Sequence, residues 1–348
     1  MLSLSAALIL SYKAASYKEQ VYAEAKEKYH AVTEKMAQHG DALLRRAMEA
    51  ADSFAEGLTE GTITRSNMGG KFKKILKEYN GIYGGSITFS PFSYDPARKL
   101  YSVYFHRAEN GQGKEELHFS QLDEIYDYTT SDYEWYVRPM SEQKNGWGSP
   151  YWDEAGKTYM ITYSSLFYKE NGDDGEKEPA GVVTVDISMK YIKRLIDEQD
   201  LGRSGFCAVT TAEGRYIYHP VRNYVVEGKT LQDVAKEKND KDREQLADMA
   251  RKGQGGIIEH ISTTTGEESW LMVEPIPITG WSLQNTFIKN DIEFNTDVIR
   301  HRKILACIST AVFMINLLAL MLTPGSFSMK KIGIFVISSS IVMITGIG

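Results

Sequence analysis

Apolar residues recur at steps of three, four or seven between residues 13 and 60, with lysines and glutamates at the positions between them. That spacing puts the apolar positions on one face of an amphipathic helix. At about 1.5 Å per residue the helix would be roughly 70 Å long. The pattern therefore predicts one long helix over 13–65 that acts as a packing surface and as a stalk. The alternative is an ordinary core helix.

Short β-branched and aromatic runs follow, separated by Gly, Asn and Pro turns. They predict strands at 86–89, 100–105, 158–167 and 181–187, with a helix at 189–197. A second set begins at residue 205, with strands at 206–210, 216–218, 255–261, 269–274 and 281–287 around a charged helix at 231–251. Two antiparallel sheets flanked by helices, an α+β fold, are the arrangement that this order favours.

The two ends of the chain are apolar. Residues 304–322 carry no charge over 19 positions, enough for a helix to cross a hydrocarbon core of about 30 Å. Residues 332–348 form a second apolar segment, and residues 1–12 resemble the end of another apolar helix. A signal peptide is the alternative for 1–12, but the basic start is missing. Residues 291–303 are expected to continue as a helix into 304–322, because no Gly or Pro interrupts them.

Composition narrows the classes of partner. The net charge of −6 and the 42% hydrophobic content are ordinary for a globular protein. Nucleic acid is not an expected partner, because the chain has no basic stripe of the kind that a phosphate backbone requires. Cys207 and Cys307 lie far apart, and no Cys or His cluster has metal-ligand spacing, so no metal or other cofactor is expected.

Candidate chemistry gathers between residues 133 and 186. Three of the five tryptophans lie there with several tyrosines, and two acids complete the set. Rings give a small-molecule pocket stiff apolar walls, and carboxylates fix the orientation of a ligand. The alternative is an aromatic core with solvated acids. In that case Asp186 would cap the helix that follows it, and Asp153 would be an exposed turn residue.

Five segments, in this order, resemble the bacterial extracytoplasmic double-Cache sensors, which are tandem PAS-like modules. The segments are ITFSPFSYDPARKLYSVYFHR, WY…W…PYWDEAGKTYMITYS, AGVVTVDISM, GRSGFCAVTTAEGRYIYHP and EPIPITGWSL. The resemblance covers roughly residues 20–300. It implies a long N-terminal helix, a membrane-distal ligand module, a membrane-proximal module and a transmembrane helix. Such domains belong to chemoreceptors, histidine kinases, serine phosphatases and cyclic-dinucleotide enzymes.

The predicted organisation combines these observations. It runs from the end of a first transmembrane helix (1–12) and the stalk helix (13–65) to the distal module with the ligand pocket (66–200), the proximal module (201–290), a linker helix (291–303), a transmembrane helix (304–322) and a second apolar segment expected to span the membrane (332–348).

Family members that bind amino acids carry an Arg, one spacer, Trp-Tyr, then Tyr-x-Asp, and an Asp at the end of the last strand. The residues that match this motif here are Trp135, Tyr136, Tyr151, Asp153 and Asp186. Tyr133 stands where the motif has its Arg, which would pair with an α-carboxylate. Arg138 or Arg107 remain as candidates for that role. The retained acids and rings favour an amine or an amino acid as ligand, through charge pairing and cation–π contact.

The resulting hypothesis is the extracytoplasmic sensing region of a bacterial transmembrane receptor in the inner membrane. The distal module would bind the small-molecule ligand and pass a helix displacement across the membrane, with a possible homodimer through the N-terminal helix. No enzymatic activity is expected within these residues, although an output domain such as a kinase or phosphatase would be enzymatic. Two alternatives stay open: a ligand-binding domain of a multi-span transporter-like protein, and a hydrolase with Asp153 and Asp186 as its acid/base pair.

Overall fold

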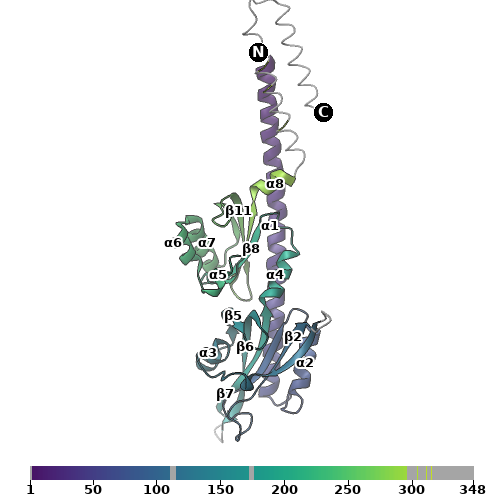
Figure 1. Ribbon diagram of the computed structural model, residues 1–348, viewed down its shortest axis with the longest axis vertical. Helices are drawn as coiled ribbons and strands as arrows, with labels where there is room; N and C mark the ends of the chain where they lie inside the picture. Colours follow the sequence, from purple (N-terminus) through teal and green to yellow (C-terminus); the bar gives the residue numbers. More distant parts are fainter. Residues whose placement is uncertain are drawn as a thin grey trace, which may run out of the picture.

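The computed structural model describes residues 2–109, 115–171 and 176–295, with three single positions beyond them. A long helix carries two antiparallel sheets along its length (Figure 1), so the predicted α+β class with a long N-terminal helix is confirmed. Apart from those three positions, the predicted span at 304–322 lies outside the described residues, as do the span at 332–348 and most of the predicted linker at 291–303. Within the described ranges, no helix combines the length and hydropathy of a membrane span.

The long helix is α1 (Leu2–Thr59), and it is continuous as predicted. Its C-terminal part packs on the distal sheet and its middle part on the proximal sheet (Figure 1). Small buried residues such as Ala47 and Ala51 let a sheet approach closely, and Phe54 fills the space beside them. Polar contacts fix the position: Tyr163 Oη donates to Asp52 at 3.1 Å, and the backbone N–H of Ile278 donates to Asp41 at 2.7 Å.

The distal module is a seven-stranded antiparallel sheet with the strand order β3-β2-β1-β7-β6-β4, and β5 also pairs with β6. Its strands are β1 (Gly84–Phe89), β2 (Ser102–Glu109), β3 (Glu115–Gln121), β4 (Gly146–Trp147), β5 (Tyr151–Asp153), β6 (Thr158–Asn171) and β7 (Glu176–Ser188). Its helices are α2 (Met68–Glu78), α3 (Glu134–Glu142) and α4 (Met189–Asp197), with a 3₁₀ turn η1 (Leu122–Glu124). The edge strand β3 was not predicted, because EELHFSQ is polar and mostly exposed.

The two faces of the distal sheet differ in chemistry because side chains alternate along each strand. One face turns buried aliphatic residues such as Ile87, Ile161 and Val185 toward the main core, to which α1 and α2 also contribute. The other face carries buried hydroxyls: Ser86 Oγ lies 2.9 Å from Thr184 Oγ1. Further hydroxyls continue the chain through Thr88 and Ser102. These hydroxyls bond to one another, so the buried polar face needs no other partners for them. Because their side chains are short, α3 can lie above this face of the sheet.

Gly85 on β1 offers a test of how closely the sheet and α2 are packed. A Cβ at this position would lie 2.2 Å from the carbonyl oxygen of Thr184 and 2.8 Å from the ring of Phe72. Gly85→Ala is therefore expected to lower the free energy of unfolding by about 1–3 kcal/mol through overpacking. Gly70→Ala is the matched control, because nothing lies within 4 Å of its Cβ position in helix α2. Urea denaturation should show the control unchanged or stabilised by about 0.5–1 kcal/mol. Equal stability of the two variants would contradict this packing.

The proximal module repeats the logic with a five-stranded antiparallel sheet, in the order β10-β11-β12-β8-β9. Its strands are β8 (Phe206–Thr210), β9 (Tyr216–Tyr218), β10 (Gly256–Ile261), β11 (Glu268–Ile276) and β12 (Trp281–Ile288), and its helices are α5 (Arg222–Val226), α6 (Leu231–Lys238), α7 (Lys241–Lys252) and α8 (Lys289–Asn295). The helix predicted over 231–251 is broken in two. Asn239 adopts a left-handed cap (φ 52°), and Asp240 then accepts from the N–H of Arg243 to start α7.

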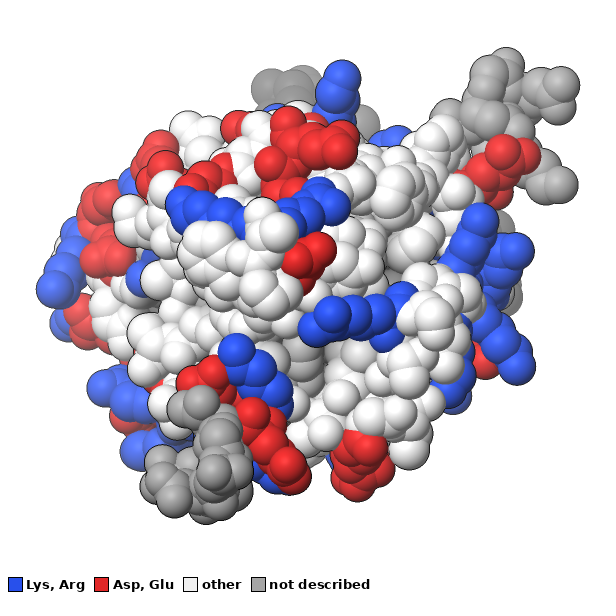
Figure 2. Space-filling model, turned by 90° about the horizontal axis from the view of Figure 1, so that it is seen from below, with Lys and Arg blue, Asp and Glu red and all other residues white. Residues whose placement is uncertain are grey.

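The modules also contact each other directly. The rings of Trp147 in the distal module and Trp281 in the proximal module meet edge to face, with centroids 5.6 Å apart. Trp152, by contrast, is 48% exposed and therefore lies outside the core. At the distal end of the molecule, acidic and basic side chains are interspersed around uncharged surface (Figure 2). This face therefore has no continuous positive patch that would attract a polyanion.

Candidate functional site

The strand register places the candidate acid Asp186 in a row across the polar face of the distal sheet. Asp186 on β7 pairs with Thr162 on β6 and with Gly84 on β1, and Gly84 pairs in turn with His106 on β2. Asp186 is 1% exposed, and its Oδ1 accepts from Thr162 Oγ1 at 2.7 Å. Its Oδ2 is buried without a hydrogen-bond partner among the described residues. A buried oxygen without a partner is costly, so packing alone does not explain Asp186 at this position.

Asp153 supplies the second carboxyl from β5. It is 4% exposed, and its Oδ2 accepts from the backbone N–H of Gly156. Burial raises the pKa of this carboxyl, and the N–H groups of Gly156 and Ala155 oppose that rise. Burial likewise raises the pKa of Asp186 to about 7; the Thr162 hydroxyl opposes the rise, and the charge of Asp153 adds to it. The pKa of both buried carboxyls is raised, and no basic side chain is among the groups that shift it. An ionised carboxylate at either position would therefore lack a nearby positive charge.

The simpler interpretations of these two acids do not hold. The helix after Asp186 is capped by Ser188, whose hydroxyl accepts from the N–H of Tyr191 at 3.2 Å. Asp153 does accept a hydrogen bond from the turn that follows it, through the N–H of Gly156, but it is almost wholly buried rather than exposed. Neither acid is therefore explained by solvation or helix capping.

Tyrosines lie near both acids, because the charges of Asp153 and Asp186 add to the burial that raises the pKa of Tyr104, Tyr126 and Tyr151. Trp135 and Tyr136, both on α3, are about 95% buried in a cluster that also holds Tyr104 and Tyr128. The carbonyl oxygen of Trp135 accepts from Ser164 Oγ at 2.7 Å, which fastens α3 to the floor of the sheet. The hydroxyls of Tyr151 and Thr162 lie 3.0 Å apart, so Tyr151 reaches the same hydroxyl that binds Asp186. Tyr133 begins α3, and its ring stacks on Tyr126 at 4.2 Å.

The two candidate arginines are held by backbone carbonyls. Arg107 donates to the carbonyls of Leu76, Tyr79 and Ile82, at the C-terminal end of α2. By strand alternation it faces away from Asp186. Arg138 donates to the carbonyl of Trp147 and pairs with Glu134 at 3.1 Å. The structure thus brings both acids close to Tyr151, places Trp135 and Tyr136 in the neighbouring aromatic cluster, and gives both guanidinium groups structural partners.

Three residues that the sequence analysis missed belong to the site. Tyr104 is 2% exposed, and its hydroxyl lowers the pKa of both carboxyls while its own hydrogen bond goes to Met160 Sδ at 3.8 Å. His106 stacks on Tyr104 at 5.1 Å, and burial lowers its pKa to about 4, so its ring is neutral at pH 7. Thr162 is the hydroxyl that binds Asp186. Alternation along one strand places Tyr104 and His106 on the same face, but the register that brings that face beside Asp186 is not specified by the sequence.

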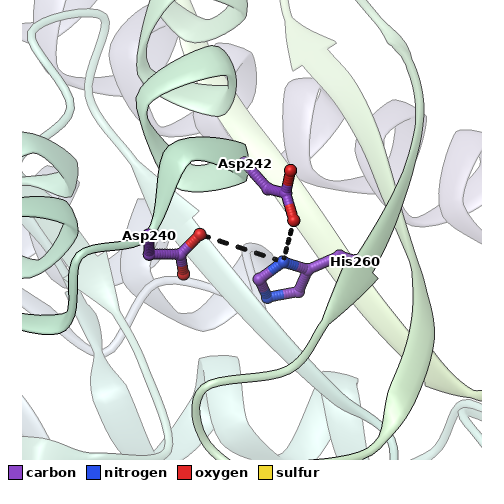
Figure 3. Close-up of side chains that lie close together, drawn as sticks. All are labelled: Asp240, Asp242 and His260. Atoms are coloured by element: carbon purple, nitrogen blue, oxygen red, sulfur yellow. Dashed lines mark hydrogen bonds and ion pairs between the residues drawn. The ribbon is translucent and has the colours of Figure 1, made fainter.

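A second cluster of potential metal ligands lies in the proximal module (Figure 3). Asp240, Asp242 and His260 bring one ligand atom each to within 4.8 Å of one another. His260 Nδ1 lies 3.1 Å from Asp242 Oδ2 and 4.0 Å from Asp240 Oδ1. Asp240 also caps α7 and pairs with Arg243 at 3.3 Å. These bonds give each of the three side chains a structural role, because they join the start of α7 to β10. The guanidinium of Arg243 beside Asp240 would also repel a cation. Sequence spacing missed the cluster because its members come from separate elements.

Comparisons with known proteins agree with this architecture. Residues 70–194 match the family model described as methyl-accepting chemotaxis protein-like, first PDC sensor domain. The chain is 22% identical over 184 residues to the methyl-accepting chemotaxis protein TlpB of Bacillus subtilis strain 168, a match that covers 51% of this chain and 24% of the relative. The chain thus spans about a quarter or less of the curated relatives that it matches.

Two solved structures extend the comparison to the whole fold. The extracellular domain of the putative histidine kinase soHK1S-Z6 has a TM-score of 0.63 at 19% identity, covering 79% of this chain and 98% of that one. The ligand-binding domain of the Pseudomonas fluorescens chemoreceptor CtaA, in complex with L-serine, has a TM-score of 0.50 at 15% identity, covering 77% and 99%. The predicted resemblance to Cache-type sensors is confirmed.

Proposed function

We propose, from the premise that residues 70–194 form a PDC-type module of the kind found in methyl-accepting chemotaxis proteins, that this chain is the sensing region of a bacterial transmembrane receptor. The similar proteins are sensor domains of chemoreceptors and histidine kinases. The same proposal places this region outside the inner membrane. It also includes a homodimer along α1 and an output domain elsewhere in the protein.

The ligand that we propose is a small molecule with an ammonium group, bound in the distal module. The observation that carries this is the buried, unpartnered Oδ2 of Asp186 beside the carboxyl of Asp153. A cation between the two would supply the missing hydrogen bonds and the missing positive charge. The rings of Tyr104 and Tyr151, which lie near both acids, suit it as well, because a π face attracts an ammonium group. Trp135, from the same aromatic cluster, is the further wall that we propose.

Amines are favoured over amino acids, although both fit the acid pair. An α-carboxylate needs a cationic partner, and Tyr133 occupies the position at which amino-acid-binding relatives carry an Arg. Arg138 is the remaining candidate on α3, and it is committed to Glu134 and to a backbone carbonyl. That the similar CtaA domain is seen with L-serine supports keeping amino acids in the screen.

The signal would travel through the helices that join the modules to the membrane. A ligand shifts an equilibrium only by binding its two conformations differently. Closure of α3 over the acids would move the distal sheet against α1, which also packs on the proximal sheet. In Figure 1 the last described helix, α8, lies beside α1 on the side away from the distal module. A displacement of either helix along the other is the proposed output.

A ligand screen tests this proposal directly. The full chain is scanned for thermal stability against amines, amino acids and amine-free organic acids. An amine at a hundredfold excess over its Kd should stabilise the protein by about 2.7 kcal/mol. Asp153→Ala and Asp186→Ala should abolish that shift, whereas Asp132→Ala, an exposed acid of the same module, should keep it.

Other outcomes would replace the proposal with its alternatives. Tight binding of amine-free acids alone would exclude an ammonium ligand. Turnover of the bound compound, lost in Asp186→Ala, would favour the hydrolase. A shift in a membrane-transport assay without any signalling output would favour the transporter-like alternative.

A further inference from the structure

A cavity of about 680 Å³ lies between the two modules, away from the distal site. Its walls come from the connecting helix α4, from β8 and β9 of the proximal sheet, and from the segment around α5. Thr158 and Tyr159, at the start of β6, close it from the distal side, and neither Asp153 nor Asp186 lines it. The volume is that of small-molecule sites, which favour interfaces between domains.

A second cavity of about 320 Å³ adjoins the first. The two share Ile196, Gln199 and Cys207 in their walls. The inner cavity is lined mainly by aliphatic residues of α1, α4 and both sheets, with Trp281 at one side. Cys207 is 1% exposed and lies at the junction of the two spaces. The pair therefore offers an outer chamber that is partly polar and an inner chamber that is apolar.

The outer chamber is basic. Lys190, Lys193 and Arg222 line it, and the acid among its lining residues, Asp197, is paired with Lys193 at 2.5 Å. Arg222, from the proximal module, lies over the ring of Tyr159 of the distal module, 4.7 Å from its centroid. A cation–π contact thus joins the two modules at this cavity.

His219 adds a neutral donor to the same wall. Its Nδ1 accepts from the backbone N–H of Val221 at 2.9 Å, which assigns the ring hydrogen to Nε2. Burial and the nearby Arg243 lower its pKa to about 3, so the ring is neutral at pH 7. This bond uses Nδ1 and leaves Nε2–H to donate to another acceptor. A ligand oxygen would give it one.

We propose that these two cavities bind an aliphatic carboxylate, with its head group among the basic residues of the outer chamber and its chain in the inner one. The net positive lining matches the head group, and apolar walls match the chain. Such a ligand would contact α4 and both sheets at once. It would therefore bind one relative arrangement of the modules better than another, and act independently of the distal ligand.

The first experiment is calorimetry of the full chain with straight-chain carboxylates from butanoate to decanoate, below their micellar concentrations. Affinity should rise by about fourfold per methylene until the inner cavity is full, from about 0.8 kcal/mol per buried CH₂. Alkylamines of the same lengths are compared in Asp186→Asn, whose distal site should take no amine, and they should bind much more weakly there than the carboxylates do. Equal binding of amines and carboxylates would overturn the charge argument, and an absence of carboxylate binding would overturn the proposal.

Variants separate this site from the distal one. Arg222→Glu should weaken binding of octanoate by about tenfold, because the charge beside the head group is reversed, although solvent screens this exposed side chain. Arg251→Glu is the matched control, an exposed arginine on α7 that does not line either cavity. Cys207→Met should remove the gain from long chains while butanoate still binds.

The distal variant completes the design. Asp186→Asn should leave octanoate binding unchanged, which would separate this site from the ligand site of the proposed function. Loss of octanoate binding in that variant, or equal affinities of Arg222→Glu and Arg251→Glu, would overturn the assignment. Thermal melts of each variant establish that it is folded before its affinity is measured.

Discussion

Asp186→Asn is expected to make the ligand-free protein more stable at pH 8 and, at the same time, unable to bind an amine. The carboxyl is almost wholly buried, and its pKa is raised from 3.8 to about 7. A raised pKa means that the folded state holds the proton more tightly than the unfolded state does. The free energy of unfolding therefore falls as the pH rises from about 4 to about 7, and stays level above that.

The size of this effect follows from the same shift. A pKa raised from 3.8 to about 7 corresponds to about 4 kcal/mol lost across that pH range. Asn removes the ionisation but must find a partner for its amide, so a gain of roughly 1–3 kcal/mol at pH 8 is expected. Urea denaturation between pH 4 and pH 8 measures it, with Asp132→Asn as the exposed control.

Bound amine should reverse the sign of the pH dependence. An ammonium group favours the ionised carboxylate, so ligand stabilisation of the natural protein should grow between pH 5 and pH 7.5. In Asp186→Asn, the free energy of unfolding of the ligand-free protein should not fall between pH 4 and pH 7. The amine should not stabilise this variant at any pH. A variant that is less stable than the natural protein at pH 8, with the same pH profile, would mean that Asp186 is ionised and satisfied in the free protein.

Phe54→Ala in α1 is expected to lower the free energy of unfolding by about 3–5 kcal/mol, because a buried Phe leaves a large cavity. Phe54 is 1% exposed, and its ring meets Phe72 of α2 edge to face, 4.9 Å between centroids. Since whole domains are stable by about 5–15 kcal/mol, the variant should melt markedly earlier. The measurement is urea denaturation followed by tryptophan fluorescence.

Phe119→Ala is the matched control in the same module. Its ring is 58% exposed on β3, so the change should stay within about 0.5 kcal/mol. The tryptophan signal samples both modules, because three of the five tryptophans lie in the distal module and two in the proximal one. A single transition is expected in Phe54→Ala, because α1 packs on both sheets. An equal loss in the two variants would contradict the role of Phe54 in the core.

Periodicity predicted the elements that bury a wide apolar face. The helix over 13–65 was readable because its apolar positions repeat over many turns, and the central strand at 181–187 because almost every residue is apolar. The strand β3 was missed because an exposed edge strand needs no apolar pattern. The break at Asn239 was missed because the charged segment keeps its helical composition on both sides.

Part of the candidate site was predictable because some of its residues are close together in the sequence. Trp135, Tyr136, Asp153 and Asp186 stood out because rings and acids cluster within one stretch of sequence. Tyr104 and His106 did not, since only the pairing of β1 with β2 and β7 brings them beside Asp186. Strand register depends on the whole sheet, and a single sequence does not specify it.

The shared helix has a consequence for how the protein unfolds. Neither module closes its apolar face by itself, because α1 forms one wall of the core of each, with Ala47 and Phe54 on the distal sheet and Tyr29 stacked on Phe287 of the proximal sheet. Removing α1 would expose both sheets, and removing one sheet would expose a strip of α1. The two modules should thus unfold together as a single cooperative unit. Limited proteolysis should therefore release no stable fragment that lacks α1.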